Sequence, residues 1–277
     1  MTIDSPPRTD VHDDPTDLTG QVVLVSGATG GIGGAVVEEL ARSDATVVLL
    51  GRDAERLEQA RRSVQARTGG RGRLIARTAD INDSDSVDAA VAAVLGEAGR
   101  IDAVVHAAGD GPVASLAEAT DAMWQRTLNG KLMGAVRLTR AVAGHMAARN
   151  HGRIVMVNGA FRTTPDPLFP VNSAVNAALA AFAKAASKDL GRSGIRVNVV
   201  DPGAVDTALW AWTAKEIADR LGGTAEDVNA QVLAQTPLGS LTRPADVARL
   251  VRFLLSPAAG QITGTAITLD GGACAAL

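Results

Sequence analysis

The chain has 277 residues, a formal net charge of −3 and a pI near 5.8, a length typical of one large domain or two small ones. Apolar residues make up 46% and charged residues 21%, so the chain can bury a full core. The mild acidity argues against a nucleic-acid or anionic-membrane surface, because both need clustered positive charge. The single cysteine, Cys274, excludes an internal disulfide and a cysteine-rich metal site. Tyrosine does not occur, so no tyrosine hydroxyl can serve as a catalytic acid.

No apolar run reaches the roughly 18 residues that a membrane-spanning helix needs, so we expect no transmembrane segment. Residues 1–17 are polar and acidic and contain three prolines. They lack the basic start and the apolar stretch of a signal peptide. We therefore expect a cytoplasmic protein with a disordered leader over residues 1–17 and a single folded domain over residues 18–277.

From residue 18 onward, short apolar segments alternate with amphipathic ones. Strands are predicted at residues 21–25, 46–50, 74–78, 103–106, 154–157, 197–200 and 266–269. Helices are predicted from the first glycine turn to residue 42 and at residues 54–67, 84–95, 121–149, 173–190 and 245–255. This alternation specifies a parallel sheet with helices on both faces. We predict an α/β fold: one doubly wound, Rossmann-type domain with a seven-stranded parallel sheet, whose ligands bind outside the carboxyl ends of the strands.

The turn after the first strand indicates a nucleotide site. Residues 26–33 read Ser-Gly-Ala-Thr-Gly-Gly-Ile-Gly, follow a strand and open a helix. Glycines permit a tight turn and let backbone N–H groups approach a pyrophosphate, which also meets the positive end of the helix. The candidate cofactor-binding residues of this turn are Gly27, Thr29, Gly30, Gly31, Ile32 and Gly33.

The ends of the second and third strands bear on the choice of cofactor. A free ribose 2′-hydroxyl is usually held by a carboxylate at the end of strand two. Here Gly51 leaves space and Arg52 offers a guanidinium group to a 2′-phosphate, which favours NADP(H) over NAD(H); the alternative is a solvated arginine. Asp80 is a candidate for binding the adenine amine, with Ile81 packing on the ring, unless Asp80 caps the helix that begins near Asp83.

Together these features resemble the short-chain dehydrogenase/reductase family over about residues 18–272. The matching motifs are Gly27-x-x-x-Gly31-Ile32-Gly33, Ala107-Ala108-Gly109, Gly152-Arg153-Ile154-Val155, Ile195-Arg196-Val197-Asn198, Pro202-Gly203-Ala204-Val205-Asp206-Thr207, Ile262-Thr263-Gly264 and Asp270-Gly271-Gly272. The resemblance implies a nicotinamide cofactor, with Ala107, Ala108, Gly109, Pro202, Gly203, Val205 and Thr207 among its contacts. It also implies a homo-oligomer, a tetramer or a dimer, in which helices 121–149 and 173–190 pair across a two-fold axis.

The family's catalytic residues are not repeated at the matching positions. Its asparagine, serine, tyrosine and lysine align with Lys131, Gly159, Asn172 and Asn176, and Asn158 precedes the serine position. Because hydride delivery to a ketone leaves an alkoxide that needs a proton, an efficient ketone reductase then requires a substitute acid. Lys131 is the strongest candidate, since desolvation lowers the pKa of a lysine toward neutrality; the alternative is that Lys131 reaches solvent. The candidate catalytic residues are Lys131, Asn172, Asn176 and Asn158.

Other polar and aromatic side chains are weaker signals. His106, at the end of strand four, is most simply a structural histidine, and no His, Asp or Glu cluster has metal-ligand spacing. The aromatic residues Phe161, Phe169, Trp210 and Trp212 fall in loops predicted after strands five and six, including a substrate loop at about residues 206–240. They predict a mostly apolar pocket, unless the tryptophans anchor a lid or a subunit contact. Arg162 is a candidate for binding a substrate anion or carbonyl.

Three functions remain open at this point. The first is an NADP(H)-dependent oxidoreductase with altered proton delivery, acting on a small apolar carbonyl or an activated alkene. The second is a non-redox enzyme, such as an isomerase, lyase or cyclase, on the same scaffold. The third is a catalytically silent NADP-binding protein. A conjugated alkene suits a site without tyrosine, because simple donors such as Asn172 or Lys131 can hold the charge of an enolate.

Overall fold

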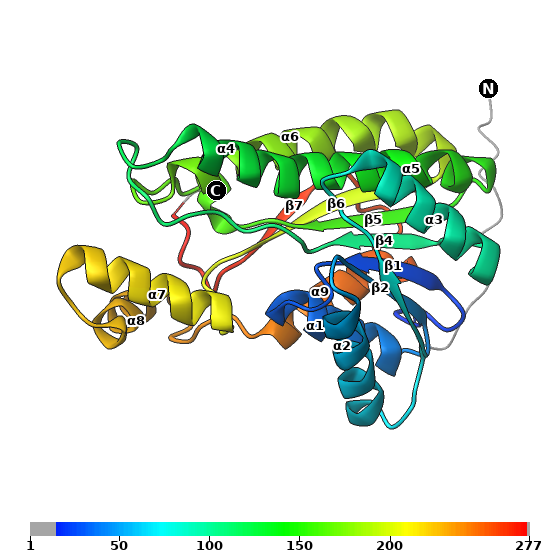
Figure 1. Ribbon diagram of the computed structural model, residues 1–277, viewed down its shortest axis with the longest axis horizontal. Coiled ribbons are helices and arrows are strands. Elements are labelled where there is room, and N and C mark those ends of the chain that lie inside the picture. The colour runs from blue at the N-terminus through cyan, green and yellow to red at the C-terminus, as the bar shows by residue number, and fades with distance from the viewer. Residues whose placement is uncertain (1–14, 276–277) are drawn as a thin grey trace.

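A single seven-stranded parallel sheet forms the centre of the molecule (Figure 1). The computed structural model describes residues 15–275, and its strand order is β3-β2-β1-β4-β5-β6-β7. The strands are β1 (Val22–Ser26), β2 (Thr46–Gly51), β3 (Arg73–Thr78), β4 (Ala103–His106), β5 (Gly152–Val157), β6 (Ile195–Pro202) and β7 (Ala266–Leu269). The strand order reverses between β1 and β4, so the predicted doubly wound fold is confirmed, with its ligand crevice at the carboxyl ends of these strands.

Helices cover both faces of the sheet. They are α1 (Gly31–Arg42), α2 (Ala54–Arg67), α3 (Ser84–Ala98), α4 (Asp121–Thr127), α5 (Gly134–Ala148), α6 (Pro170–Leu190), α7 (Ala208–Leu221), α8 (Ala225–Ala234) and α9 (Pro244–Leu255), with a π-helical turn at Leu128–Met133 and 3-10 turns at Ala160–Arg162, Gly191–Ser193 and Pro257–Ala259. Figure 1 shows α3, α5 and α6 on one side of the sheet and α1, α2 and α9 on the other.

Successive residues of each strand pack alternately into two separate hydrophobic cores. In β1, Val23 and Val25 pack with α1, α2 and α9, whereas Val22 and Leu24 pack with α3, α5 and α6. Side chains alternate across a strand, so an unbroken β-branched run is what a sheet buried on both faces requires. The two cores hold the strands in register, and the carboxyl ends of β1, β4, β5 and β6 therefore lie side by side.

Two predicted segments differ from the structure. The helix predicted at residues 121–149 ends at Ala148 and is interrupted by the π turn at Leu128–Met133. The substrate loop predicted at 206–240 is mostly helical, since α7 and α8 lie within it, and Trp210 and Trp212 are therefore on a helix and not in a loop. Both helices carry strong caps: Thr207 accepts a hydrogen bond from the N–H of Trp210, and Thr224 begins a reciprocal capping box.

Helices α7 and α8 stand apart from the two sheet cores (Figure 1). They share a small apolar cluster of their own, composed of Trp210, Ala214, Ile217, Ala218, Ala225 and Val228. An ion pair ties this helical pair to the loop after β4, because Arg220 Nη1 lies 2.6 Å from Glu118 Oε1. We refer to α7 and α8 together as the lid.

Both ends of the chain lie partly outside the described residues. Most of the predicted leader, residues 1–14, is not described, and a leader ending at residue 17 stays a prediction. Residues 15–17 of this predicted leader are described, and Pro15 contacts the domain, since the Ala258 N–H donates to the Pro15 carbonyl at 3.1 Å. Within residues 15–275, no helix combines the length and the apolar character needed to cross a membrane.

Candidate active site

A cavity of about 420 Å³ lies at the carboxyl ends of the strands. Its floor is formed by the glycine turn after β1 and by the segments that follow β4, β5 and β6. Its outer wall comes from α6 and the lid, with Leu209, Trp210 and Val232 contributing apolar side chains. Most predicted site residues line this cavity: Gly30, Gly31, Ile32, Gly33, Ala107, Gly109, Lys131, Asn158, Asn172, Asn176, Pro202, Gly203, Val205 and Thr207. The structure therefore brings the candidate catalytic residues and the core of the candidate cofactor site into one crevice.

The glycine turn fits a dinucleotide phosphate. Gly30 caps α1 without a side-chain hydrogen bond, so the N–H groups of the first helical turn, which lines the cavity, have no side-chain cap. Gly27 has φ +72°, a conformation that favours glycine. A Cβ at Gly33 would lie 2.1 Å from the Gly27 carbonyl oxygen, and a Cβ at Gly31 would lie 2.6 Å from Thr207 Cγ2. The turn is thus closed by contacts that only glycine allows.

The remaining candidate cofactor residues, namely Gly27, Thr29, Arg52, Asp80, Ile81 and Ala108, do not line the cavity itself. Arg52 is exposed at the end of β2 and makes no ion pair with any residue in 15–275. Asp80 Oδ1 accepts hydrogen bonds from the backbone N–H and the amide nitrogen of Asn82, at 3.0 and 2.9 Å. The alternative that Asp80 caps the following helix is wrong, because the side chain of Asp83 caps α3.

Lys131 lies in the π turn, and His106 holds the backbone there. The Nε2 of His106 is 3.0 Å from the carbonyl oxygen of Lys131, and its Nδ1 is 2.8 Å from Ser26 Oγ. Because a carbonyl only accepts, Nε2 carries the proton, and Ser26 donates to Nδ1. Burial lowers the pKa of His106 to about 4, so the ring is neutral at pH 7. This confirms the structural reading of His106 and ties the π turn to β1 and β4.

The side chain of Lys131 is buried in the cavity wall. It is 8% exposed, and Nζ donates to the carbonyl oxygen of Asn158 at 3.2 Å. Burial lowers the pKa of Lys131 to about 8, and the charges of Asp201 and Asp110 oppose this change. The alternative that Lys131 reaches solvent is therefore wrong. No carboxylate in residues 15–275 lies within ion-pair distance of the ammonium group.

The end of β5 is held by a buried polar network. Asn158 Nδ2 donates to Asp201 Oδ1 at 2.8 Å and to the Asn176 carbonyl at 3.1 Å. Asn176, which is 2% exposed, donates from Nδ2 to the Gly159 carbonyl at 3.2 Å. A Cβ at Gly159 would lie 3.0 Å from this amide nitrogen. The amide of Asn176 thus fills the space that a side chain at position 159 would enter.

Asn172 lies apart from this network. It packs against Gly111, in the loop after β4, so closely that a Cβ there would lie 1.6 Å from Asn172 Oδ1. The two candidate amides of α6 therefore differ in setting. Both line the cavity, but Asn176 is fixed by the turn after β5, whereas Asn172 lies beside the segment that follows β4.

Aromatic residues form the apolar part of the cavity. The rings of Phe161 and Phe169 stack with centroids 4.2 Å apart, and both line the cavity. Trp210 also lines it, and its indole N–H donates to Asn229 Oδ1 in α8 at 2.8 Å. Trp212 does not line it and is 45% exposed. The predicted aromatic wall is thus present, with Trp210 and not Trp212 as its lid residue.

Sequence reasoning missed the role of Asp201. This residue at the end of β6 is 0% exposed, and Arg162 Nε donates to its Oδ2 at 2.6 Å. The Nε of Arg162 is therefore bound within the protein, and its role toward a substrate anion or carbonyl stays a prediction. The available signal was a charged residue at the end of a buried apolar strand, in the sequence Val-Val-Asp-Pro-Gly.

Comparison with known proteins identifies the class. A family model described as enoyl-(acyl carrier protein) reductase matches residues 27–274. The short-chain reductase protein NovJ of Streptomyces niveus is 34% identical over 269 residues, which cover 93% of this chain and 98% of that protein. The fold, the glycine turn and these matches define an oxidoreductase that uses a nicotinamide cofactor.

Solved structures agree. L-sorbose reductase from Gluconobacter frateurii, complexed with NADPH and L-sorbose, is 31% identical, with a TM-score of 0.87 over 95% of this chain and 100% of that chain. An NAD⁺-bound xylitol dehydrogenase is 27% identical, with a TM-score of 0.87 over 92% of this chain and 99% of that chain. This chain belongs to the short-chain dehydrogenase/reductase family.

Proposed function

We propose that this protein is an NADP(H)-dependent oxidoreductase in which the ammonium group of Lys131, and not a tyrosine hydroxyl, supplies the proton. The observation that carries the proposal is the placement of Lys131: buried in the cavity wall, hydrogen-bonded to one neutral carbonyl, and with its pKa lowered to about 8. A general acid works best when its pKa lies near the working pH. The absence of tyrosine from the chain leaves this role to another group.

When bound, a reduced nicotinamide supplies the hydride, which reaches the carbonyl carbon of a ketone or the β-carbon of an activated alkene. Lys131 Nζ then gives one proton to the alkoxide or enolate and is left as a neutral amine, which solvent reprotonates. The Asn158 carbonyl orients Nζ during this transfer. The amide of Asn172 offers a hydrogen-bond donor for the charge of an enolate, which needs less help from a strong acid than an alkoxide does.

Lys131 also serves the cofactor in this proposal. The family places an asparagine at the position of Lys131 and a lysine at the position of Asn176. In this chain the ammonium group is therefore carried by the π turn before α5 and not by α6. We expect Lys131 to contact the nicotinamide ribose hydroxyls, directly or through a water. Loss of such a charge-assisted bond should weaken cofactor binding roughly 10- to 150-fold, from about 1.5–3 kcal/mol.

Arg52 selects the phosphorylated cofactor. It is exposed beyond β2 without an ion-pair partner among the described residues, and one structural neighbour is complexed with NADPH while another is bound to NAD⁺. We expect NADPH to bind at least about tenfold more tightly than NADH. Fluorescence titration of both cofactors into the wild-type protein and Arg52→Asp tests this, and equal affinities in the wild type contradict it.

The substrate side of the cavity favours an apolar carbonyl or an activated alkene. Its walls are the stacked Phe161 and Phe169 with Leu209, Trp210 and Val232, and apolar walls with few polar groups are typical of small-molecule sites. The description of the matching family model, an enoyl reductase, names an alkene substrate. We propose apolar ketones and conjugated enones as the first substrates to assay.

The test is NADPH oxidation with a panel of such ketones and enones. We expect turnover by the wild-type protein, and we expect Lys131→Ala to lower it by about 10²- to 10⁴-fold while also weakening NADPH binding. Lys184→Ala is the matched control, because Lys184 is exposed and likewise donates to a backbone carbonyl, that of Gly264, at 2.9 Å. If Lys131→Ala leaves both turnover and NADPH affinity within about twofold of the wild type, Lys131 is a bystander and the proposal fails. Tight NADPH binding without turnover on any substrate would favour a catalytically silent protein.

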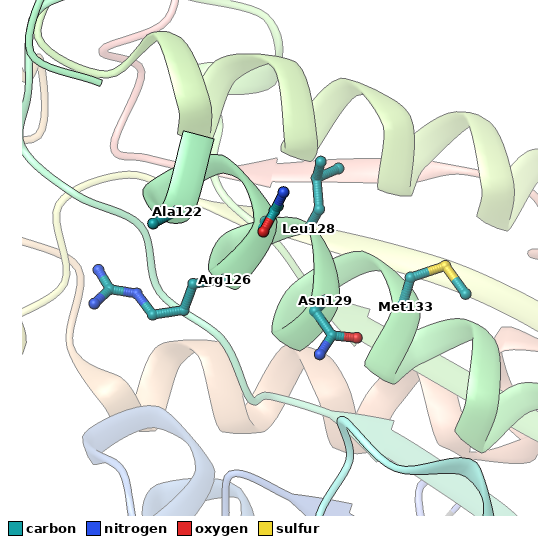
Figure 2. Close-up of a pocket in the computed structure, with 6 residues that line it drawn as sticks. Ala122, Arg126, Leu128, Asn129 and Met133 are labelled. Carbon is teal, nitrogen blue, oxygen red and sulfur yellow. The ribbon is translucent and has the colours of Figure 1, made fainter. Parts of the chain in front are cut away.

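We also propose that the protein is a homo-oligomer, a tetramer or a dimer, built on α4, α5 and α6. An open groove of about 520 Å³ lies on α4 and the π turn, bordered by Arg126, Asn129 and Met133 (Figure 2). On α6 the exposed residues include the small side chains Ala174, Ala177, Ala181 and Ala185, which permit close helix packing. Light scattering at micromolar concentration tests this, and a monomer refutes it.

A further inference from the structure

A fully buried carboxylate lies directly behind the candidate active site. Asp201 accepts hydrogen bonds from Arg162 Nε at 2.6 Å, from Asn158 Nδ2 at 2.8 Å and from the Gly159 N–H at 3.3 Å. Its side chain is 0% exposed, and that of Arg162 is 23% exposed. A buried ion pair is a poor source of stability, because desolvation of the two charges offsets most of their attraction. The position of the Asp201–Arg162 ion pair in the fold therefore points to a role in organising the active site.

The ion pair fixes the turn that ends β5. Asn158 Nδ2 faces two groups that only accept, Asp201 Oδ1 and the Asn176 carbonyl, so the orientation of this amide is determined. Arg162 belongs to the 3-10 turn that follows, and Asp201 to the adjacent strand. Asp201 thus holds the side chain at position 158, the backbone at position 159 and the turn at position 162 at once.

The same turn presents the acceptor of the Lys131 ammonium group. Nζ donates to the Asn158 carbonyl oxygen at 3.2 Å, so whatever fixes Asn158 also fixes Nζ. Two carboxylates act on Lys131 by charge, Asp201 from β6 and Asp110 from the loop after β4. Arg162 pairs with Asp201. His106 from β4 is neutral and bonds the Lys131 backbone.

We propose that Asp201, paired with Arg162, is a positioning residue that orients Lys131 through the Asn158 turn and sets the charge that this lysine experiences. The proposal rests on the proposed role of Lys131 as proton donor. It goes beyond that role by assigning its support to a carboxylate that makes no hydrogen bond with Lys131 Nζ and does not itself line the cavity.

Two substitutions at one position separate geometry from charge. Asp201→Asn keeps an oxygen that can accept from Asn158 and Gly159 but removes the negative charge. Asp201→Ala removes both. The matched control is Asp102→Asn: Asp102 is also 0% exposed and pairs with Arg100 and Arg149, but it lies before β4, at the opposite end of the sheet.

The first readout does not need turnover. The chain has only four lysines, Lys131, Lys184, Lys188 and Lys215, so NMR titration of the Nζ groups in lysine-labelled protein gives four side-chain signals. The Lys131 signal is assigned by its absence from Lys131→Met. Because the Asp201 charge opposes the lowering of the Lys131 pKa, both Asp201 variants should move its titration midpoint further down, whereas Asp102→Asn should not.

The second readout is steady-state kinetics. We expect Asp201→Ala to lower kcat for NADPH-dependent reduction about 10- to 100-fold with a smaller change in KM, because misplacement of the acid affects the chemical step. Asp201→Asn should restore part of this loss. If Asp201→Ala does not fold, the midpoint in Asp201→Asn decides the question.

An unchanged Lys131 midpoint in Asp201→Asn, or a shift equal to that of Asp102→Asn, overturns the proposal. The two hypotheses fail separately. If Lys131→Ala retains turnover, the proton-donor role fails while the NMR midpoint still reports on Asp201. If Lys131→Ala loses turnover and the Asp201 variants match the control, only the positioning role fails.

Discussion

Replacing Lys131 by methionine should stabilise the protein while removing its activity. The pKa of Lys131 falls from 10.5 to about 8 on burial, a decrease of about 2.5 units, and each unit corresponds to about 1.36 kcal/mol. The charged form is therefore destabilised by about 3 kcal/mol in the folded protein at pH 7. Methionine fills similar space without this cost but loses the bond to the Asn158 carbonyl, worth about 1 kcal/mol. The net expected gain is about 2 kcal/mol.

The pH dependence gives the sharper test. The folded-state pKa of Lys131 is depressed below its unfolded value, so the penalty on the wild type is fully present below pH 8 and disappears as the pH rises from 8 toward 10.5. The advantage of Lys131→Met should accordingly be largest at pH 7 and shrink by pH 9.5. A gain of about 2 kcal/mol corresponds to roughly 4–8 °C in Tm for a chain of this size.

Thermal unfolding of both proteins at pH 7 and pH 9.5, at one protein concentration, provides the measurement. Lys184→Met is the control and should change Tm little at either pH, because this lysine is exposed. No gain at pH 7, or an equal gain at both pH values, would refute the reasoning. A stable but inactive Lys131→Met would show that the site sacrifices stability for chemistry.

Three further outcomes are expected. Gly33→Ala should weaken cofactor binding about tenfold or more, because the new Cβ would lie 2.1 Å from the Gly27 carbonyl oxygen. Gly34→Ala is the control: its Cβ would lie 3.6 Å from the nearest atom, so the cofactor affinity measured by titration should not change. Asn229→Ala should raise KM for apolar substrates about fivefold or more by releasing the Trp210 indole N–H, and an unchanged KM would exclude this positioning. The rate of reduction should be constant below pH 8 and decrease above it, since only protonated Lys131 donates; a rate that rises above pH 8 would exclude Lys131 as the acid.

The sheet and its cofactor turn were predictable because their signals are local. A β-branched run such as 22–26 has to be buried on both faces, and a glycine turn between a strand and a helix has few other uses. Caps also mark helix ends within a few residues: Asp53 caps α2, whose bounds match the helix predicted at 54–67. The lid helices were missed, because residues 206–240 were predicted as a substrate loop although the capping box Thr224–Asp227 marks the start of one helix.

The chemistry of the site was only partly predictable, because it depends on contacts between distant segments. The π turn at Leu128–Met133 is stabilised by His106, which lies more than 20 residues earlier in the chain, and no helical periodicity reveals such a contact. Asp201 and Arg162 are 39 positions apart, so their pairing emerges only when β5 and β6 lie side by side. The burial of Lys131 follows from the same tertiary arrangement, which sequence reasoning had left open.

The separate apolar cluster of the lid has a consequence for how this scaffold diversifies. Ala214, Ala218 and Val228 bury their side chains between α7 and α8 and outside the cores that hold the sheet. Such a segment can unfold locally at a free energy below that of the whole domain, so its amide protons should exchange with solvent well before those of β1 or β4. The lid is also a contiguous segment that recombination can replace as one unit. Exchange of residues 208–234 with those of a relative would transplant a substrate preference while leaving the folding core and the nucleotide turn intact.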